Sequence, residues 1–196
     1  MSDNLRRIVL PTIYDYFSKP RKKRALQYVA WWGNSFEKWL QWKIVFALEP
    51  VMQKMKGNPW DYEKWRIEHR TTVKCRTKTK RRSKRIQWDM VMLGVEPLYL
   101  QFKVCCPCGG IPTKFWDGAN SLTNDVRHVR RFRRGSAAAL LFVLEHEKAR
   151  IHFEHPGVTS PAVASPRKIE LGRTWCEACG KDQKMWARIY HWTNDL

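Results

Sequence analysis

One continuous apolar segment sets the expected fold class: Ala137-Ala138-Ala139-Leu140-Leu141-Phe142-Val143-Leu144. An apolar run of this length without a polar interruption is typical of a strand that is buried on both faces, as in a sheet covered by helices on each side. We therefore expect this segment to be a central strand of an α/β protein.

The residues before this run contain three further strand patterns and two helix patterns. Strands are expected at 65–74, 86–93 and 98–105, and a turn at Gly94-Val95-Glu96-Pro97 joins the last two. The order helix, three strands, helix, strand predicts an α/β fold with a mixed central sheet flanked by helices.

The two expected helices have recognisable ends. Asn34-Ser35-Phe36-Glu37 is a capping box that opens the first helix, which we expect to stop before Pro50. Ser121 or Thr123 caps the second helix, which runs to Arg134.

The expected organisation along the chain has four parts. Residues 1–33 form a basic lead-in, residues 34–155 the α/β core, residues 156–168 a proline-containing linker, and residues 169–196 the closing segment. Within these parts, further strands are expected at 150–155 and 185–192.

The composition indicates a polyanionic partner. The 196 residues carry 37 Lys and Arg against 18 Asp and Glu, a formal charge of +19. Nucleic acid is favoured over an acidic membrane, because no apolar run approaches the ~20 residues of a spanning helix. The N-terminus lacks the apolar region of a signal peptide, which favours a reducing compartment: the cytoplasm, in association with the nucleoid, or the nucleus for a protein of a eukaryotic virus or host.

Two cysteine motifs predict a structural zinc site. Cys105 and Cys108 form one C-x-x-C-G turn, and Cys176 and Cys179 form another. Four thiolates with no open position are typical of structural Zn²⁺, which would join two knuckles in a small zinc-ribbon-like lobe, with the first knuckle inserted at 105–110. Two disulfides with two spare cysteines, or buried apolar cysteines, are the alternatives, and Cys75 and Cys106 are interpreted as non-ligands.

A second group of polar residues falls on two neighbouring strands. Asp89 lies within the apolar strand at 86–93, and Gln101 and Lys103 project on one face of the next strand. An acid, an amide oxygen and a lysine at one sheet edge can hold a divalent cation and a water, as phosphodiester hydrolysis requires.

Taken with the element order, these residues resemble the PD-(D/E)xK nuclease superfamily, which has the restriction-endonuclease-like fold. Its signature is a Glu on the first helix, an Asp on one strand and (D/E)-x-K on the next, followed by a helix and a strand. The matching positions are Glu37, Asp89 and Gln101-Phe102-Lys103, within residues 35–145. Gln101 stands where the commonest form has an acid, and this is similar to the Q-x-K variant found among some restriction endonucleases and transposon nucleases.

The resemblance implies a role for each of these residues. Asp89 and the Gln101 side-chain oxygen would coordinate Mg²⁺ or Mn²⁺, with Glu37 contributing directly or through a water. Lys103 would orient the attacking water and stabilise charge on the phosphate.

Each residue also has an ordinary structural interpretation. Glu37 is the expected partner of Asn34 in the capping box, Asp89 can pair with Arg85 or Lys103, and Gln101 with Lys103 can form a solvated strand face. The acids that could replace Glu37 are Glu49, Glu63 and Glu68.

Basic residues gather in two segments that we expect to contact phosphates. The first segment contains Lys74, Arg76, Lys78, Lys80, Arg81, Arg82, Lys84 and Arg85, and the second contains Arg127, Arg130, Arg131, Arg133 and Arg134. Both segments are also compatible with solvated charge runs or nuclear-localisation signals. The tryptophans that could stack on unpaired bases are Trp31, Trp32, Trp60, Trp116 and Trp175, although most tryptophans belong to cores.

Three functions are compatible with these patterns. The principal hypothesis is a metal-dependent DNA endonuclease of restriction, repair or mobile-element type, acting as a homodimer or with a partner protein. The alternative is a non-catalytic, zinc-containing nucleic-acid-binding protein on a decayed nuclease fold. A structural virion or nucleoid protein is the third.

Overall fold

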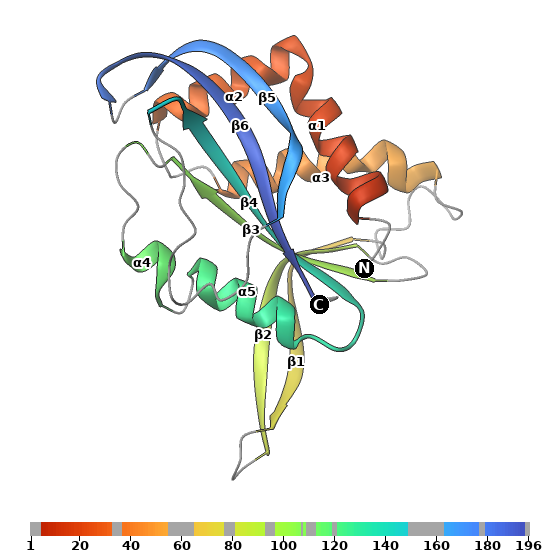
Figure 1. Ribbon diagram of the computed structural model, residues 1–196. Coiled ribbons are helices and arrows are strands. Elements are labelled where there is room, and N and C mark those ends of the chain that lie inside the picture. Colours follow the sequence, from red (N-terminus) through yellow and green to blue (C-terminus); the bar gives the residue numbers. More distant parts are fainter. Residues whose placement is uncertain are drawn as a thin grey trace.

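The computed structural model describes residues 5–32, 37–54, 65–76, 81–92, 97–106, 108, 113–118, 121–148, 163–176 and 179–194. In these residues the chain forms a mixed sheet of six strands in the order β1-β2-β3-β4-β6-β5, with helices on both faces (Figure 1). The strands are β1 (Trp65–Arg76), β2 (Arg81–Met92), β3 (Leu98–Cys105), β4 (Ser136–His146), β5 (Val163–Cys176) and β6 (Lys181–Thr193). The α/β class, the mixed sheet and the flanking helices expected from the sequence are confirmed.

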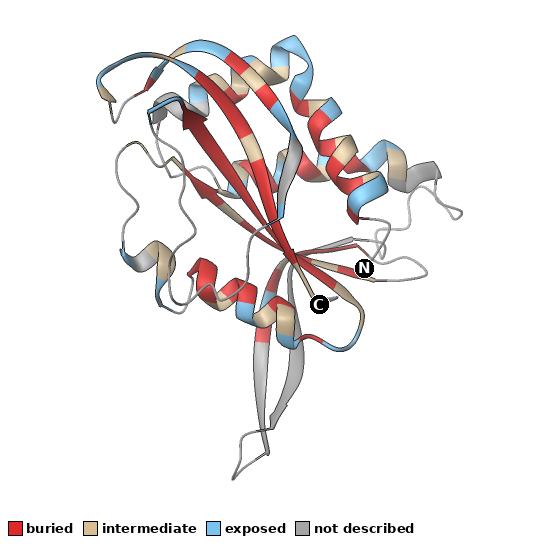
Figure 2. Cartoon of the chain, in the orientation of Figure 1, coloured by how far each residue is buried: buried red, intermediate tan, exposed pale blue. Residues whose placement is uncertain are grey.

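The apolar run at 137–144 lies in β4, which pairs with β3 in parallel and with β6 in antiparallel orientation. Its side chains alternate between two cores: Leu140 and Phe142 belong to one cluster, while Leu141 and Val143 belong to the other. Burial of β4 on both faces follows from this central position, and Figure 2 shows the strand buried along almost its whole length.

The first face of the sheet is covered by the N-terminal helices. These are η1, one π-helical segment (Leu5–Val9), α1 (Leu10–Ser18), α2 (Pro20–Trp32) and α3 (Glu37–Lys54). Ile13 and Phe17 of α1 and Leu40 of α3 are fully buried against this face. The helices at 5–32 therefore contribute buried side chains to the first core, and the interpretation of this segment as a separate lead-in is corrected.

The second face is covered by α4 (Thr113–Trp116) and α5 (Leu122–Arg131), which lie between the parallel strands β3 and β4 in the chain. Ser121 caps α5, because its hydroxyl accepts a hydrogen bond from the N–H of Asn124. Val126 and Val129 pack into the second core. The expected helix is confirmed, with its end three residues earlier than Arg134.

Other boundaries differ from expectation. α3 continues through Pro50 to Lys54, and Pro50 is exposed. β6 begins at Lys181, before the expected closing strand at 185–192. The strand expected at 150–155 lies outside the described residues, as does most of the linker, and β5 begins at Val163 within the remainder.

The C-terminal cysteines lie at the β5–β6 connection of the main sheet. Cys176 is the last residue of β5, and Cys179 follows shortly before β6. The hairpin pairs with β4 through β6, so the segment expected to form a small separate lobe is part of the central sheet. No described helix combines the length and apolar character needed to cross a membrane.

Candidate functional site

The candidate site lies where β2 and β3 separate. Their ladder pairs residues 90–92 with residues 98–100. Beyond the ladder, two side chains form hydrogen bonds with backbone groups of the facing strand. Asp89 Oδ2 accepts a 2.7 Å hydrogen bond from the N–H of Phe102. Gln101 Nε2 donates one of 2.7 Å to the carbonyl of Gln87. Both side chains are thus held at the opening between the strands.

Lys103 joins this opening to helices on both faces of the sheet. Its Nζ is 3.3 Å from Glu37 Oε1 at the start of α3 and 3.4 Å from Asp125 Oδ2 on α5. The Lys103 side chain is only 14% exposed. Alternation along β3 directs Phe102 into the first core and Lys103 towards α5.

The burial of these charges changes their protonation. Burial raises the pKa of Asp89 to about 6. The hydrogen bond from the Phe102 N–H and the nearby Lys103 charge lower this pKa, but by less than burial raises it. Burial also raises the pKa of Asp125 to about 7, although Lys103 opposes the shift. The pKa of Lys103 is lowered by burial but raised by a larger amount by Asp125, Glu37 and Asp89, so the ammonium stays protonated.

These residues offer the donor atoms that a hard divalent cation prefers. Asp89 and Glu37 supply carboxylate oxygens, and Gln101 has Oε1 for a ligand because its Nε2 is engaged. The carboxylates are spread around the Lys103 ammonium. Among the described residues, the one group of three or more ligand atoms close enough together to hold a metal ion is a separate Cys/His group, whose atoms all lie within 4.8 Å of one another.

The residues predicted for catalysis, Glu37, Asp89, Gln101 and Lys103, therefore lie around one opening. Of the substitutes for Glu37, Glu49 is exposed on α3. Glu63 lies outside the described residues, as does Asn34, the expected capping partner of Glu37. The side chain of Glu68 is not described.

Asp125 was not predicted for the site. It occupies a buried position on α5, on the same stripe as Leu122, Val126 and Val129. An acid at a core position of an amphipathic helix was the available signal, since such a position is normally apolar.

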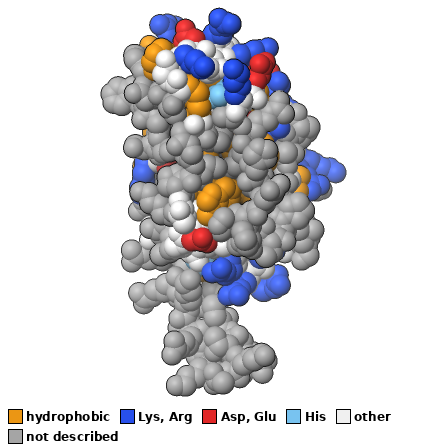
Figure 3. All heavy atoms as spheres, turned by 60° about the vertical axis from the view of Figure 1, so that its left-hand side comes forward, with side chains coloured by type: hydrophobic (Ala, Val, Ile, Leu, Met, Phe, Trp, Pro, Cys, Tyr) orange, Lys and Arg blue, Asp and Glu red, His pale blue; other side chains and the backbone are white. Residues whose placement is uncertain are grey.

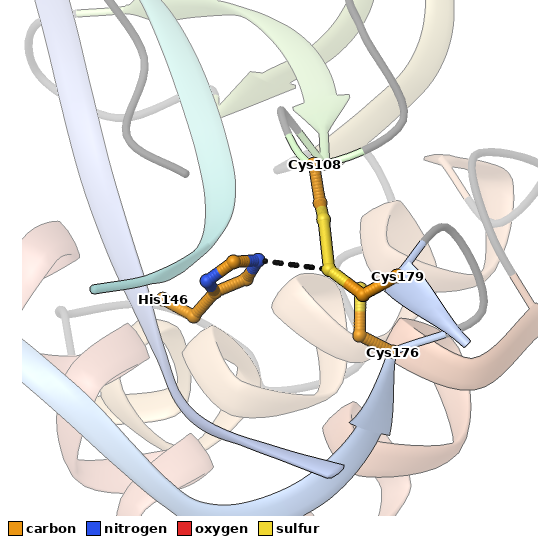
Figure 4. Close-up of side chains that lie close together, drawn as sticks. All are labelled: Cys108, His146, Cys176 and Cys179. Carbon is orange, nitrogen blue, oxygen red and sulfur yellow. Dashed lines mark hydrogen bonds between the residues drawn. A yellow bond between two sulfur atoms is a disulfide. The ribbon is translucent and has the colours of Figure 1, made fainter. Parts of the chain in front are cut away.

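A second site lies beside the first core at the carboxyl ends of β3, β4 and β5, where four residues form the group that could hold a metal ion: Cys108, His146, Cys176 and Cys179. Figure 4 shows the imidazole of His146 pointing towards the sulfurs, with Nε2 3.3 Å from Cys179 Sγ. Cys108 and Cys179 are joined by a disulfide in this structure. Because metal ligation needs free thiolates, these two cysteines can bind a metal only when the disulfide is reduced.

The predicted ligand Cys105 does not belong to this group, and His146 is present instead. Cys105 is the last residue of β3 and faces the second core, together with Val143. Residues of β4 with even numbers face the first core, so His146, at the end of this series, reaches Cys179. The prediction of Cys105 as a ligand is thus corrected by strand alternation, and no C-x-x-C spacing marks His146.

The hydrogen bonding of His146 sets a condition for metal binding. Its Nδ1 accepts a 3.2 Å hydrogen bond from the N–H of Lys148, so the neutral ring carries its proton on Nε2. Burial lowers the pKa of this imidazole, and the Lys148 and Lys181 charges add to the effect. Metal binding at Nε2 requires the proton to move to Nδ1 and the bond from Lys148 to be released.

Cys106, interpreted as a non-ligand, also lies beside this group. It packs against the first core with Cys108 and Cys179 and interacts with Cys176. Burial raises the pKa of the Cys106 thiol to about 11, with the neighbouring Cys176 contributing. Cys75 has no described side chain.

The predicted basic segments lie on the β1–β2 hairpin and on α5. The first segment forms the paired ends of β1 and β2, a hairpin that extends away from the body of the molecule in Figure 1. Lys78 and Lys80 lie outside the described residues, and the other side chains of this segment are not described. On and after α5, Arg127, Arg131 and Arg134 are exposed, whereas Arg130 is half-buried. Figure 3 shows Lys and Arg side chains gathered at the upper end and in the lower half of one face.

One predicted stacking residue lines a hollow of about 180 Å³ between α2 and β5. Trp175 is 42% exposed there and Tyr28 is 48% exposed. Arg24 and Arg173 are the charged residues of the lining, and both are exposed. This combination of aromatic and guanidinium groups suits a base and its phosphate.

No protein-family model matches the chain, and neither a curated protein nor a solved structure matches it.

Proposed function

We propose that the protein is a divalent-metal-dependent DNA endonuclease of the PD-(D/E)xK type. The observation that carries the proposal is the convergence of Asp89, Gln101 and Lys103 with Glu37 at the opening between β2 and β3. These are the residues that the resemblance selected; Asp89, Gln101 and Lys103 come from two consecutive strands, and Glu37 comes from a helix 66 residues before Lys103.

In this proposal Asp89, Glu37 and the Gln101 Oε1 atom hold one Mg²⁺ or Mn²⁺. When bound, the cation polarises a phosphoryl oxygen and lowers the pKa of a bound water. The residues of the chain supply the oxygen ligands, and the Phe102 N–H fixes the orientation of the Asp89 carboxylate. A carboxylate with one oxygen fixed in this way needs little reorganisation to act as a ligand.

Lys103 supplies the positive charge at the reacting phosphate. Its pKa is raised by the surrounding carboxylates despite burial, so the ammonium can stabilise charge that develops on the phosphate and can orient the attacking water. Glu37 positions the Lys103 Nζ from α3. Hydrolysis by in-line attack would leave a 5′ phosphate.

The charge distribution supports DNA as the substrate. The formal charge is +19, and exposed arginines lie on α5, the helix that also carries the buried Asp125. Contacts of this kind bind the phosphate backbone without reading the sequence.

Cleavage of supercoiled plasmid tests the proposal. Wild type is compared in Mg²⁺ and in Mn²⁺ with Asp89→Ala, Lys103→Ala and Glu37→Gln, and Glu49→Gln is the matched control on the same helix. We expect nicking by wild type and Glu49→Gln, and a loss of at least ~100-fold in the three site variants. Equal nicking by all five proteins would assign the activity elsewhere and refute the proposal.

One observation favours the non-catalytic alternative. Asp89 and Gln101 both satisfy backbone groups at the opened ladder, which is a sufficient structural reason for their presence. A protein of this kind would bind plasmid with the usual salt dependence but would not nick it in either metal.

We also propose that Cys108, His146, Cys176 and Cys179 bind structural Zn²⁺ when reduced. Three thiolates and one imidazole form a complete tetrahedral set without an open position. Protein purified with a reductant should contain about one zinc per chain, and Cys176→Ser should release it. Cys105→Ser is the control, because Cys105 faces the other core, and it should retain the zinc. Zinc-free reduced wild type would refute this assignment.

A further inference from the structure

Asp125 is buried at the inner surface of α5 without a hydrogen-bond partner for one of its oxygens. The residue is 6% exposed, and Oδ2 has no hydrogen bond although it is 3.4 Å from Lys103 Nζ. A buried carboxylate is costly unless hydrogen bonds or a cation compensate it. Asp125 lies in the first turn of α5, where the helix N-terminus favours a carboxylate, but Oδ2 accepts no hydrogen bond from the helix.

The Asp125 oxygen points to the predicted catalytic residues. Lys103 Nζ lies between it and Glu37, and the Asp89 charge is close enough to affect Asp125. Asp125 therefore faces the opening between β2 and β3 from the side opposite to α3.

The predicted ligand set has an amide, Gln101, at the position where the commonest form of the motif has an acid. The amide contributes no charge, and its Nε2 is engaged by the Gln87 carbonyl. With Asp125 included, three carboxylates and one ammonium leave two formal negative charges, which one divalent cation neutralises. Without Asp125 the same group leaves one.

We infer that Asp125 is a carboxylate ligand of the catalytic divalent cation and supplies the charge that Gln101 lacks. This inference rests on the proposed nuclease function, since it concerns the same site. In the cation-free protein, the Lys103 ammonium lies between the carboxylates of Glu37 and Asp125 and offsets their repulsion.

Direct measurement of Mn²⁺ binding tests the inference without reference to cleavage. Free Mn²⁺ is followed by electron paramagnetic resonance during titration of reduced, zinc-loaded protein, so that manganese does not occupy the Cys/His group. The proteins compared are wild type, Asp125→Asn and Asp89→Asn. Asp182→Asn is the matched control, because Asp182 is exposed on β6.

We expect wild type and Asp182→Asn to bind one Mn²⁺ with the same affinity, and both site variants to bind at least ~10-fold more weakly. If Asp125→Asn binds like wild type and Asp89→Asn does not, the inference is overturned and the proposed site stands. If both variants bind like wild type, or wild type binds no Mn²⁺, the proposed site and the inference are overturned together.

A second substitution guards against a folding defect in one variant. Asp125→Ser is smaller and also neutral, so it must lose the same affinity if the carboxylate is the ligand. Far-ultraviolet circular dichroism establishes that each variant is folded before titration. Affinity retained by folded Asp125→Ser would overturn the inference.

Discussion

Replacing Asp125 by the isosteric Asn should stabilise the cation-free protein. Burial raises the pKa of this carboxyl from 3.8 to about 7, so the folded protein retains a proton that the unfolded chain releases between these values. The free energy of unfolding of wild type therefore falls as the pH rises from about 4 to about 7, and the Asp125→Asn variant does not lose this stability. Asp89 has a pKa shift of the same sign, but it is present in both proteins and largely cancels in the comparison.

The size of the effect follows from the shift. A pKa shift of about three units changes the free energy of unfolding by roughly 4 kcal/mol when the carboxyl is fully ionised. Because Asp125 and the other carboxylates interact with the same Lys103 ammonium, we expect Asp125→Asn to gain about 2 to 4 kcal/mol at pH 8. At pH 5 wild-type Asp125 is protonated in the folded state, and the gain should be about 2 kcal/mol smaller than at pH 8. For a chain of this length, the gain at pH 8 corresponds to a rise of roughly 5 to 15 °C in Tm.

Urea unfolding at pH 5 and pH 8 measures this difference, with zinc-loaded reduced protein and no other divalent cation. The exposed control Asp182→Asn should stay within about 0.5 kcal/mol of wild type at both pH values. Addition of Mn²⁺ at pH 8 should stabilise wild type more than Asp125→Asn, because the cation compensates the buried charge. An Asp125→Asn protein that is no more stable than wild type at pH 8, or whose gain is the same at both pH values, would refute the electrostatic reasoning.

Three further results are expected. Leu141→Ala removes a fully buried side chain of β4 and should cost about 2 to 5 kcal/mol in urea unfolding, whereas the exposed Val163→Ala should cost less than about 0.5 kcal/mol; equal costs would contradict the central position of β4. Replacing Arg127 and Arg131 by Ala should make duplex DNA binding less dependent on salt. In fluorescence anisotropy, the slope of the logarithm of the binding constant against the logarithm of the salt concentration should fall in magnitude by about 0.9 for each phosphate that the protein no longer neutralises. An unchanged slope would place the interface elsewhere. Trp175→Ala should weaken single-stranded DNA binding by about 1 to 3 kcal/mol in the same assay if a base stacks in the hollow lined by Trp175, and no weakening would argue against stacking there.

Local sequence patterns were sufficient for the strands of the sheet centre. β3 spans the predicted residues 98–105, and β4 contains the whole apolar run. β4 was predictable because burial on both faces leaves an uninterrupted apolar run, and β3 because the apolar residues Leu98, Leu100, Phe102 and Val104 alternate along it. The helix through Pro50 was not predictable, because locally a proline favours a helix end, and the sequence does not show that the helix continues past it.

The candidate sites were partly predictable for a similar reason. Asp89 and Lys103 were conspicuous because they interrupt strand patterns, and the two cysteine turns had recognisable spacing. Asp125 and His146 have no motif of their own. Their involvement depends on α5 crossing over Lys103 and on the face to which the end of β4 turns.

The amino-acid order alone determined the α/β class, the central strands and the basic character, because these properties depend on each residue and its near neighbours. Tertiary packing decided which groups meet. The parting of β2 from β3 gathers Asp89 and Gln101, α3 and α5 bring Glu37 and Asp125 to Lys103 from opposite faces, and strand alternation exchanges Cys105 for His146. Such meetings join residues tens of positions apart, and only the three-dimensional course of the backbone sets their distances.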